Sequence, residues 1–281
     1  MQKLSILSYN THLFWKSIAA SVDGSLVYKD SERLNALVDY CNKSNYDIIG
    51  LSEVWGHDVQ NQLKINFAEC GMNSFAFQGE AITSASSGLF LAFRGQVDGV
   101  MSFDYYYNLV GPDKLSAKGV VHGVLKINGV RVYVIQTHTQ ASYVGTEARD
   151  DAARKEQIMQ TLFPIIDTVK ENYPDLPIFL LGDLNIVANS EQYEWFAKRL
   201  NYRGFNDAWV DANGSDNGIT YDPRNNLLVK HFDPKQDVAQ RIDYIFYTKS
   251  ILNVKNMRVV KWKTDGDLDL SDHYGVDCFF G

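Results

Sequence analysis

The sequence has few cysteines, few prolines and no recognisable linker. Its three cysteines, Cys41, Cys70 and Cys278, are odd in number and follow no spacing pattern, which argues against a disulfide framework and against a thiolate zinc site. The chain has only six prolines, no low-complexity stretch and no block of like charge among its 281 residues. We therefore predict one domain that spans residues 1–281.

Long apolar runs and an excess of basic residues are also missing. No apolar stretch is long enough to span a bilayer, and the opening MQKLSILSYN is typical of a strand rather than of a leader peptide. This is expected of a cytoplasmic protein, or of a secreted one whose leader has been removed. The 27 basic residues are scattered and outnumbered by 34 acidic ones, giving a net charge of -7. That balance disfavours a nucleic-acid binder, although a local basic groove can lie on an acidic protein.

The chain is rich in short strands with a few helices between them. Expected strands cover residues 3–10, 46–53, 87–93, 120–127, 130–138, 177–183, 241–248, 254–262 and 274–280, and expected helices cover 31–43, 58–70, 147–172 and 190–200. Gly71 suits the C-terminus of the second helix, Pro164 should interrupt the third near Phe163, and Asn189 or Ser190 can cap the fourth. Numerous strands with few, unevenly spaced helices favour an α/β fold of two stacked sheets flanked by helices.

Polar residues of metal-ligand or proton-transfer type fall at or near the ends of six of these strands. They are Asn10 (followed by Thr11 and His12), Glu53, His138, Asp183 with Asn185, Asp243, and the pair Asp272 and His273. One such residue alone is usually a turn residue or a satisfied core polar group, and Gly-Asp-x-Asn at 182–185 is ordinary turn chemistry. Six placements of this kind predict a shared site at one rim of the stacked sheets.

The composition of this set indicates a hard divalent cation. Carboxylate and amide oxygens without cysteine suit Mg²⁺ or Mn²⁺ better than zinc. Glu53, with Asn10 and Asp272 nearby, is the expected ligand set. A histidine beside such a metal suits general-base catalysis near neutral pH, and Asp243 is the candidate for the carboxylate that orients it.

The ordered motifs SYN, LSE, QTH, GDLN, RIDYI and SDH resemble those of the exonuclease–endonuclease–phosphatase superfamily, which includes deoxyribonuclease I, abasic-site endonucleases, inositol phosphatases and neutral sphingomyelinases. The resemblance implies a four-layer α/β/β/α sandwich and metal-dependent cleavage of a phosphate ester, with Mg²⁺ as cofactor and Mn²⁺ or Co²⁺ as possible substitutes. The roles that it implies are metal binding for Asn10 and Glu53, a place beside the metal for Asp272, positioning of water and phosphate for Asp183 and Asn185, phosphate contact for His138, and a catalytic dyad for Asp243 and His273.

Four further stretches are similar to the sphingomyelinase branch. They are THTQAS, ARKEQ, SAKGVVHGVLKI and TYDPRNNLL. The third makes Lys118 a candidate phosphate contact, with a solvated surface lysine as the alternative, and the fourth, taken alone, is better explained as an Asp-Pro turn. This branch implies hydrolysis of a phospholipid head group, sphingomyelin giving ceramide and phosphocholine, by a monomer acting at a membrane surface.

Two other functions and a docking element stay open at this point. A nuclease could use the same residues to cleave DNA or RNA, and a non-catalytic binding module could keep the fold, although the intact set of polar residues argues against the module. Residues 101–109, MSFDYYYNL, are the nearest candidate for a membrane-docking element because tyrosines suit the lipid–water interface. The alternative is an aromatic strand that packs on the sandwich.

Overall fold

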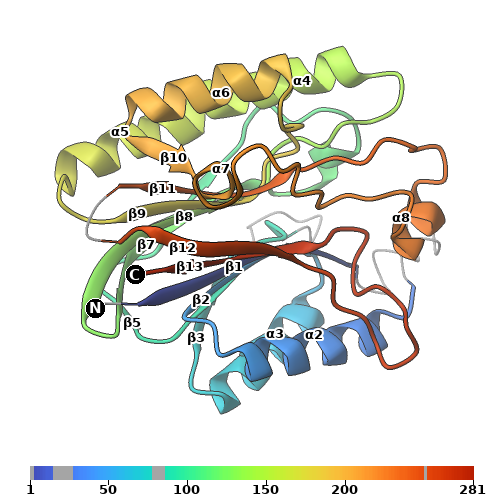
Figure 1. The fold of residues 1–281 in the computed structure, drawn as a ribbon, viewed down its shortest axis with the longest axis horizontal. Coiled ribbons are helices and arrows are strands. Elements are labelled where there is room, and N and C mark those ends of the chain that lie inside the picture. The colour runs from blue at the N-terminus through green and yellow to red at the C-terminus, as the bar shows by residue number, and fades with distance from the viewer. Residues whose placement is uncertain (1–2, 15–27, 78–85, 250–251) are drawn as a thin grey trace.

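Two β-sheets are stacked face to face in the computed structural model, which describes residues 3–14, 28–77, 86–249 and 252–281 (Figure 1). The first sheet has the order β12 (Val254–Val260), β13 (Gly275–Phe280), β1 (Leu4–Leu13), β2 (Ile48–Val54), β4 (Phe90–Phe93), β3 (Asn73–Ala76). The second has the order β10 (Phe205–Asp207), β11 (Asp243–Thr248), β9 (Ile178–Asp183), β8 (Val130–Thr137), β7 (Gly119–Ile127), β5 (Gln96–Val97), and β6 (Ser102–Tyr105) also pairs with β7.

Helices cover the outer face of each sheet. α2 (Asp30–Ser44) and α3 (His57–Glu69) lie below the first sheet in Figure 1, and α4 (Glu147–Gln157), α5 (Phe163–Asn172) and α6 (Glu191–Tyr202) lie above the second. Shorter helical segments are η2 (Gly111–Leu115), η3 (Ile158–Leu162), α7 (Ala208–Asn213) and α8 (Leu227–Phe232). The predicted four-layer α/β/β/α sandwich is confirmed. Within the described ranges, no helix combines the length and apolar character needed to cross a bilayer.

Alternating side chains explain why the central strands are apolar on both faces. In β9, Phe179 and Leu181 pack between the two sheets, whereas Ile178 and Leu180 pack under the helices of the second sheet. A strand buried on both faces reads as a continuous apolar run, which is the pattern of IFLL in the sequence. The helices therefore close the outer faces, and the residues left for chemistry are those at the strand ends.

The structure confirms the expected interruption of the third helix and adds detail to the expectation in two other places. The helix expected over 147–172 is divided by one π-helical turn, Ile158–Leu162, just before Pro164, whose ring cannot sit in a regular helix interior. The edge strands β3, β5 and β10 are short and carry little alternation. Residues 101–109 include the edge strand β6, where Phe103 stacks on Phe77, so the aromatic-strand alternative holds for residues 102–105. After this strand, Tyr106 is buried and Tyr107 is exposed.

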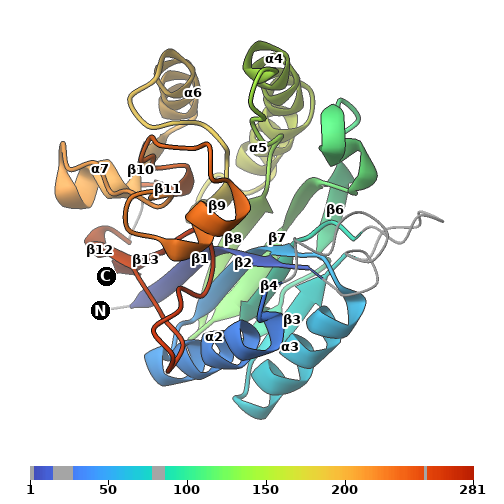
Figure 2. The same cartoon turned by 90° about the vertical axis from the view of Figure 1, so that its right-hand side faces the viewer.

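Parallel pairing at the centre of each sheet brings the functional strand ends to one edge. β1 pairs in parallel with β2, and β8 pairs in parallel with β9, so the carboxyl ends of each pair lie together, and the hydrogen bond from Asn10 to Asp183 joins the two pairs across the stacked sheets. Gly182 permits the close approach of β9 to β8, because its φ is 141° and a Cβ there would lie 1.8 Å from the Thr137 carbonyl oxygen. Figure 2 views the molecule onto the end that carries α8.

Candidate active site

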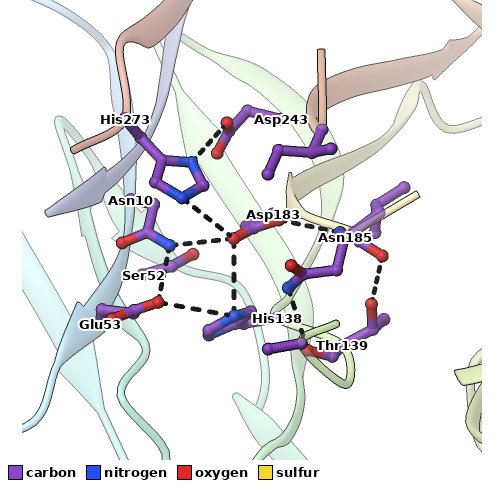
Figure 3. Close-up of polar contacts among 12 residues, drawn as sticks. Asn10, Ser52, Glu53, His138, Thr139, Asp183, Asn185, Asp243 and His273 are labelled. Carbon is purple, nitrogen blue, oxygen red and sulfur yellow. Dashed lines mark hydrogen bonds and ion pairs between the residues drawn. The ribbon is translucent and has the colours of Figure 1, made fainter. Parts of the chain in front are cut away.

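Side chains from four other segments gather around the Asp183 carboxylate at the end of β9 (Figure 3). Asn10 Nδ2 donates to Asp183 Oδ2 and to Glu53 Oε1, both at 2.9 Å. The Nε2 atoms of His138 and His273 lie 3.5 Å and 3.9 Å from the same Asp183 oxygen. The structure thus brings together residues from the ends of β1, β2, β8 and β9 and from the segment before β13.

His273 and Asp243 form a buried pair. His273 Nδ1 donates to Asp243 Oδ2 at 2.8 Å, and Asp243 has no solvent exposure. Burial lowers the pKa of His273, but the facing carboxylates of Asp243 and Asp183 outweigh burial and hold this pKa well above its ordinary value. In the neutral ring, Asp243 holds the Nδ1 proton, so Nε2 is the atom that can take a proton from a molecule lying beside Asp183.

The GDLN segment is both a turn and a site element. Asp183 Oδ1 accepts a hydrogen bond from the Asn185 backbone N–H at 2.8 Å, and Asn185 Nδ2 donates to the Thr139 carbonyl at 3.3 Å. Burial, and then the nearby Asp243 carboxylate, raise the pKa of Asp183 to about 7. The turn therefore aims one carboxylate oxygen at Asn10 and His138 while the other holds the backbone of the turn.

Lys118 is buried behind His138, so the alternative of a solvated surface lysine is wrong. Its Nζ donates to Asp113 Oδ2 at 2.7 Å and to the Thr139 carbonyl at 3.0 Å, and lies 3.1 Å from His138 Nε2. Because an ammonium group can only donate, His138 Nε2 accepts in this arrangement. Burial and the Lys118 charge lower the pKa of His138, which keeps its ring neutral. Contact of either residue with phosphate requires one of these bonds to be exchanged, and stays a prediction.

Glu53 provides the carboxylate best placed to hold a cation. Among the described residues, its Oε2 has only long contacts, 3.4 Å to Trp55 Nε1 and 3.6 Å to His12 Nδ1, and its side chain is partly accessible. Donor atoms of Glu53, His138 and Asp183 lie within 4.8 Å of one another. This set of oxygens with one imidazole fits a hard divalent cation. Asn10 turns its amide N–H groups toward the carboxylates, so ligation through its oxygen would need the amide to turn over.

Asp272 lies beside this cation set, and His12 separates it from Glu53. His12 Nδ1 is 3.3 Å from Asp272 Oδ2, and the His12 ring stacks on Phe232 with centroids 4.0 Å apart. Burial raises the pKa of Asp272, but His12, and then His273, outweigh burial and lower it. The structure therefore places Asp272 against an imidazole, and its predicted place among the metal ligands stays a prediction.

Backbone strain is concentrated at this site. His12, Glu53 and Asn185 adopt φ values of 45°, 58° and 50°, which makes them three of the eight non-glycine residues with positive φ in the described part of the chain. Such conformations persist where the surrounding structure fixes them, and they cluster at functional sites. From the sequence, His12 is identified only as a residue near a strand end. Nothing in the sequence indicates the buried network of Lys118, Asp113 and the Thr139 carbonyl.

Each of the three site histidines also contacts an aromatic ring. His12 stacks on Phe232, His138 lies 6.2 Å from Trp55 between ring centroids, and His273 meets the Tyr221 ring at 5.2 Å. Rings of this kind limit the access of water and lower the local dielectric constant, which strengthens the polar interactions around Asp183.

Comparison with known proteins identifies relatives over nearly the whole chain. A model described as the Endonuclease/Exonuclease/phosphatase family matches residues 7–273. Sphingomyelinase C from Listeria ivanovii is 31% identical over 183 residues, which cover 60% of this chain and 52% of the relative. The chain spans about half the length of the curated relatives that it matches.

Solved structures share the architecture. The crystal structure of SmcL has a TM-score of 0.77 and 25% identity, covering 99% of both chains. D. rerio TDP2, complexed with a single-strand DNA product, has a TM-score of 0.71 and 17% identity over 100% of both chains, a likeness in fold alone.

Proposed function

The chain belongs to the endonuclease/exonuclease/phosphatase family, and on this basis we propose that it is a metal-dependent phosphodiesterase that hydrolyses a phospholipid head group, with sphingomyelin as substrate. The observation that carries the proposal is the convergence of Glu53, His138 and the His273–Asp243 pair on Asp183. A buried imidazole held by a carboxylate, next to a cation-binding carboxylate, supplies the groups that phosphodiester hydrolysis needs.

His273 acts as the general base on a water molecule in this proposal. The neutral ring is the form that acts: Asp243 holds its Nδ1 proton, and Nε2 is then free to accept a proton from a water that Asp183 aligns. Asp243 also stabilises the imidazolium that forms, because the two side chains are buried together. The water then attacks the phosphorus on the side opposite the leaving alkoxide.

Asn185 and the bound cation would contact the phosphoryl oxygens, on the side of the site opposite His273. Asn185 Nδ2 donates to an exchangeable partner, the Thr139 carbonyl, at 3.3 Å, so it can turn to an incoming phosphate oxygen. Glu53 and Asp183, with Asn10 beside them, would hold the Mg²⁺ ion, and Mn²⁺ or Co²⁺ would fit the same donors. The ion, when bound, neutralises negative charge that develops on the phosphate oxygens and on the leaving alkoxide.

A lipid rather than a nucleic acid is supported by three observations. The named relative from Listeria ivanovii is a sphingomyelinase C. The chain carries a net charge of -7, whereas a nuclease gains affinity from phosphate contacts by clustered basic residues. Phe232, Trp55 and Tyr221 line the histidines, and aromatic faces attract a quaternary ammonium head group.

A substrate panel with Mg²⁺ and with EDTA tests the proposal. Sphingomyelin, lysophospholipids, inositol phosphates and single- and double-stranded DNA are assayed side by side. We expect Mg²⁺-dependent release of phosphocholine from sphingomyelin, and no release in EDTA. Cleavage of DNA without cleavage of any lipid would instead assign the nuclease function, and equal turnover in EDTA would remove the metal from the mechanism.

A further inference from the structure

Two successive backbone carbonyls just before the catalytic histidine are each held by a buried side chain from another part of the fold. The Leu270 carbonyl accepts from Arg33 Nη1 at 2.7 Å, and the Ser271 carbonyl accepts from Asn226 Nδ2 at 2.8 Å. Asp272 and His273 follow directly. The chemistry proposed above uses neither Arg33 nor Asn226, and neither side chain touches the catalytic groups.

Arg33 uses all of its five N–H groups, although it lies on a helix that covers the outside of a sheet. Nη1 also donates to the Thr11 carbonyl at 3.0 Å, and Nη2 donates to the His12 carbonyl at 2.7 Å. The remaining bonds go to the Tyr28 carbonyl and the Asp30 carboxylate. One fully buried guanidinium thus joins the end of β1, where His12 is held at a positive φ, to the segment that carries His273.

Asn226 holds the same segment from the opposite side. Its Oδ1 accepts from the Leu228 and Val229 backbone N–H groups and caps α8, while its Nδ2 reaches Ser271. The next residue in the chain adds a second link, because the Leu227 N–H donates to Asp269 Oδ2 at 3.0 Å. Asn226 is fully buried, so it links α8 directly to the segment that carries His273, with no solvent between them.

We propose that Arg33 and Asn226 are a pair of positioning residues that fix the backbone at Leu270 and Ser271 so that two adjacent side chains serve different halves of the site. Asp272 meets His12, whereas His273 meets Asp243 and Asp183. A rotation of this short segment would move both at once. Since a displacement of about 1 Å from productive geometry can lower a rate by about 10²-fold, such a clamp has a direct effect on turnover.

This inference rests on the proposed function, so its test includes a readout that does not need turnover. Asn226→Ser keeps an oxygen that can cap α8 and removes the amide that reaches Ser271. Asn213→Ser is the matched control, because Asn213 Nδ2 makes a single bond to the Met257 carbonyl, 3.1 Å long and on the distant α7–β12 side. Each protein is assayed well below its unfolding midpoint.

Arg33→Lys provides the second variant and keeps the positive charge while removing the guanidinium fork. Arg94→Lys is its control, because Arg94 also donates to backbone carbonyls, those of Tyr46 and Cys70, far from the site. We expect kcat to fall by about ten- to hundredfold in Asn226→Ser and Arg33→Lys with KM changed less than about threefold. Both controls should stay within about twofold of the wild-type kcat.

The ring proton on His273 Nδ1 gives the independent readout by NMR. Its hydrogen bond to Asp243 should produce a downfield resonance in the wild type that moves upfield or broadens in both clamp variants and in neither control. An unchanged resonance together with a near-wild-type kcat would overturn the proposal, and so would equal changes in the controls. If the wild type cleaves no substrate in the panel, the proposed function fails, and the resonance still decides whether the clamp exists.

Discussion

Asp243→Asn removes one buried negative charge from the dyad and keeps the size of the side chain. In the wild type, Asp243 Oδ2 accepts the Nδ1 proton of His273 at 2.8 Å. An asparagine can present its amide N–H to Nδ1 instead, which would put the ring proton on Nε2, the atom that must accept a proton from water. Loss of the correct tautomer and of the stabilising charge should lower kcat by about 10³- to 10⁴-fold, as for the serine protease triad.

That loss corresponds to about 4 to 5.5 kcal/mol of transition-state stabilisation, at about 1.36 kcal/mol per tenfold change in rate. The effect on folding should be much smaller. The charged hydrogen bond contributes about 1.5–3 kcal/mol, but the substitution also removes a buried charge that raises the pKa of Asp183 by repulsion. We therefore expect the free energy of unfolding at neutral pH in EDTA to stay within about 1 kcal/mol of the wild-type value.

Steady-state kinetics on the best substrate and urea unfolding of the same preparation measure the two quantities separately. A large loss of kcat without a matching loss of stability supports the assigned dyad. Retention of more than a tenth of the wild-type kcat would refute the reasoning, because the orientation of His273 would then not depend on Asp243. Asp211→Asn is a suitable control, since Asp211 accepts a bond from Tyr247 outside the site.

Three further predictions concern the metal, the turn and pH. Glu53→Gln should weaken Mg²⁺ binding at least tenfold in calorimetry, and an unchanged titration would remove Glu53 from the metal site. Gly182→Ala should destabilise the fold by about 3 kcal/mol or more in urea, because its Cβ would meet the Thr137 carbonyl oxygen at a positive φ, whereas Gly129→Ala, with open space around it, should cost about 1 kcal/mol. In EDTA, the contribution of Asp183 to stability should fall as pH rises from about 4 through about 7, because the folded state holds a proton on Asp183 that the unfolded chain releases near its ordinary pKa. The free energy of unfolding of the wild type should therefore decrease relative to that of Asp183→Asn over this range, and a difference that does not change with pH would contradict the assignment.

The fold was predictable wherever burial forces a strong local pattern. Strands such as Ile178–Asp183 are apolar because both faces are covered, and the cap at Ser190 and the stop at Gly71 follow from backbone chemistry. Short edge strands such as Gln96–Val97 make few contacts and carry no such pattern. The π-helical turn before Pro164 was predictable only as an interruption, because its form depends on packing around the helix.

The site was predictable as a set of residue types at strand ends, but its internal contacts were not. The stacking of the two sheets explains why Asn10 on β1 and Asp183 on β9, far apart in sequence, meet at 2.9 Å. The burial of Lys118 and the left-handed backbone of Glu53 depend on tertiary packing, so no local pattern carries them. Arg33 looks like any polar residue on an amphipathic helix, and only the three-dimensional arrangement shows that its side chain is enclosed.

The antiparallel pairing of β1 with β13 has a consequence for the order of folding. Leu4 lies opposite Phe280 and Ser8 lies opposite Val276, so this strand pair closes a loop that contains nearly all the other elements. Contacts of such long sequence separation carry a large loop-closure entropy and form late in most chains. Because His273 lies two residues before β13 and Asn10 lies in β1, the chain should gain activity in the same late step, and refolding followed by secondary structure should run ahead of refolding followed by turnover.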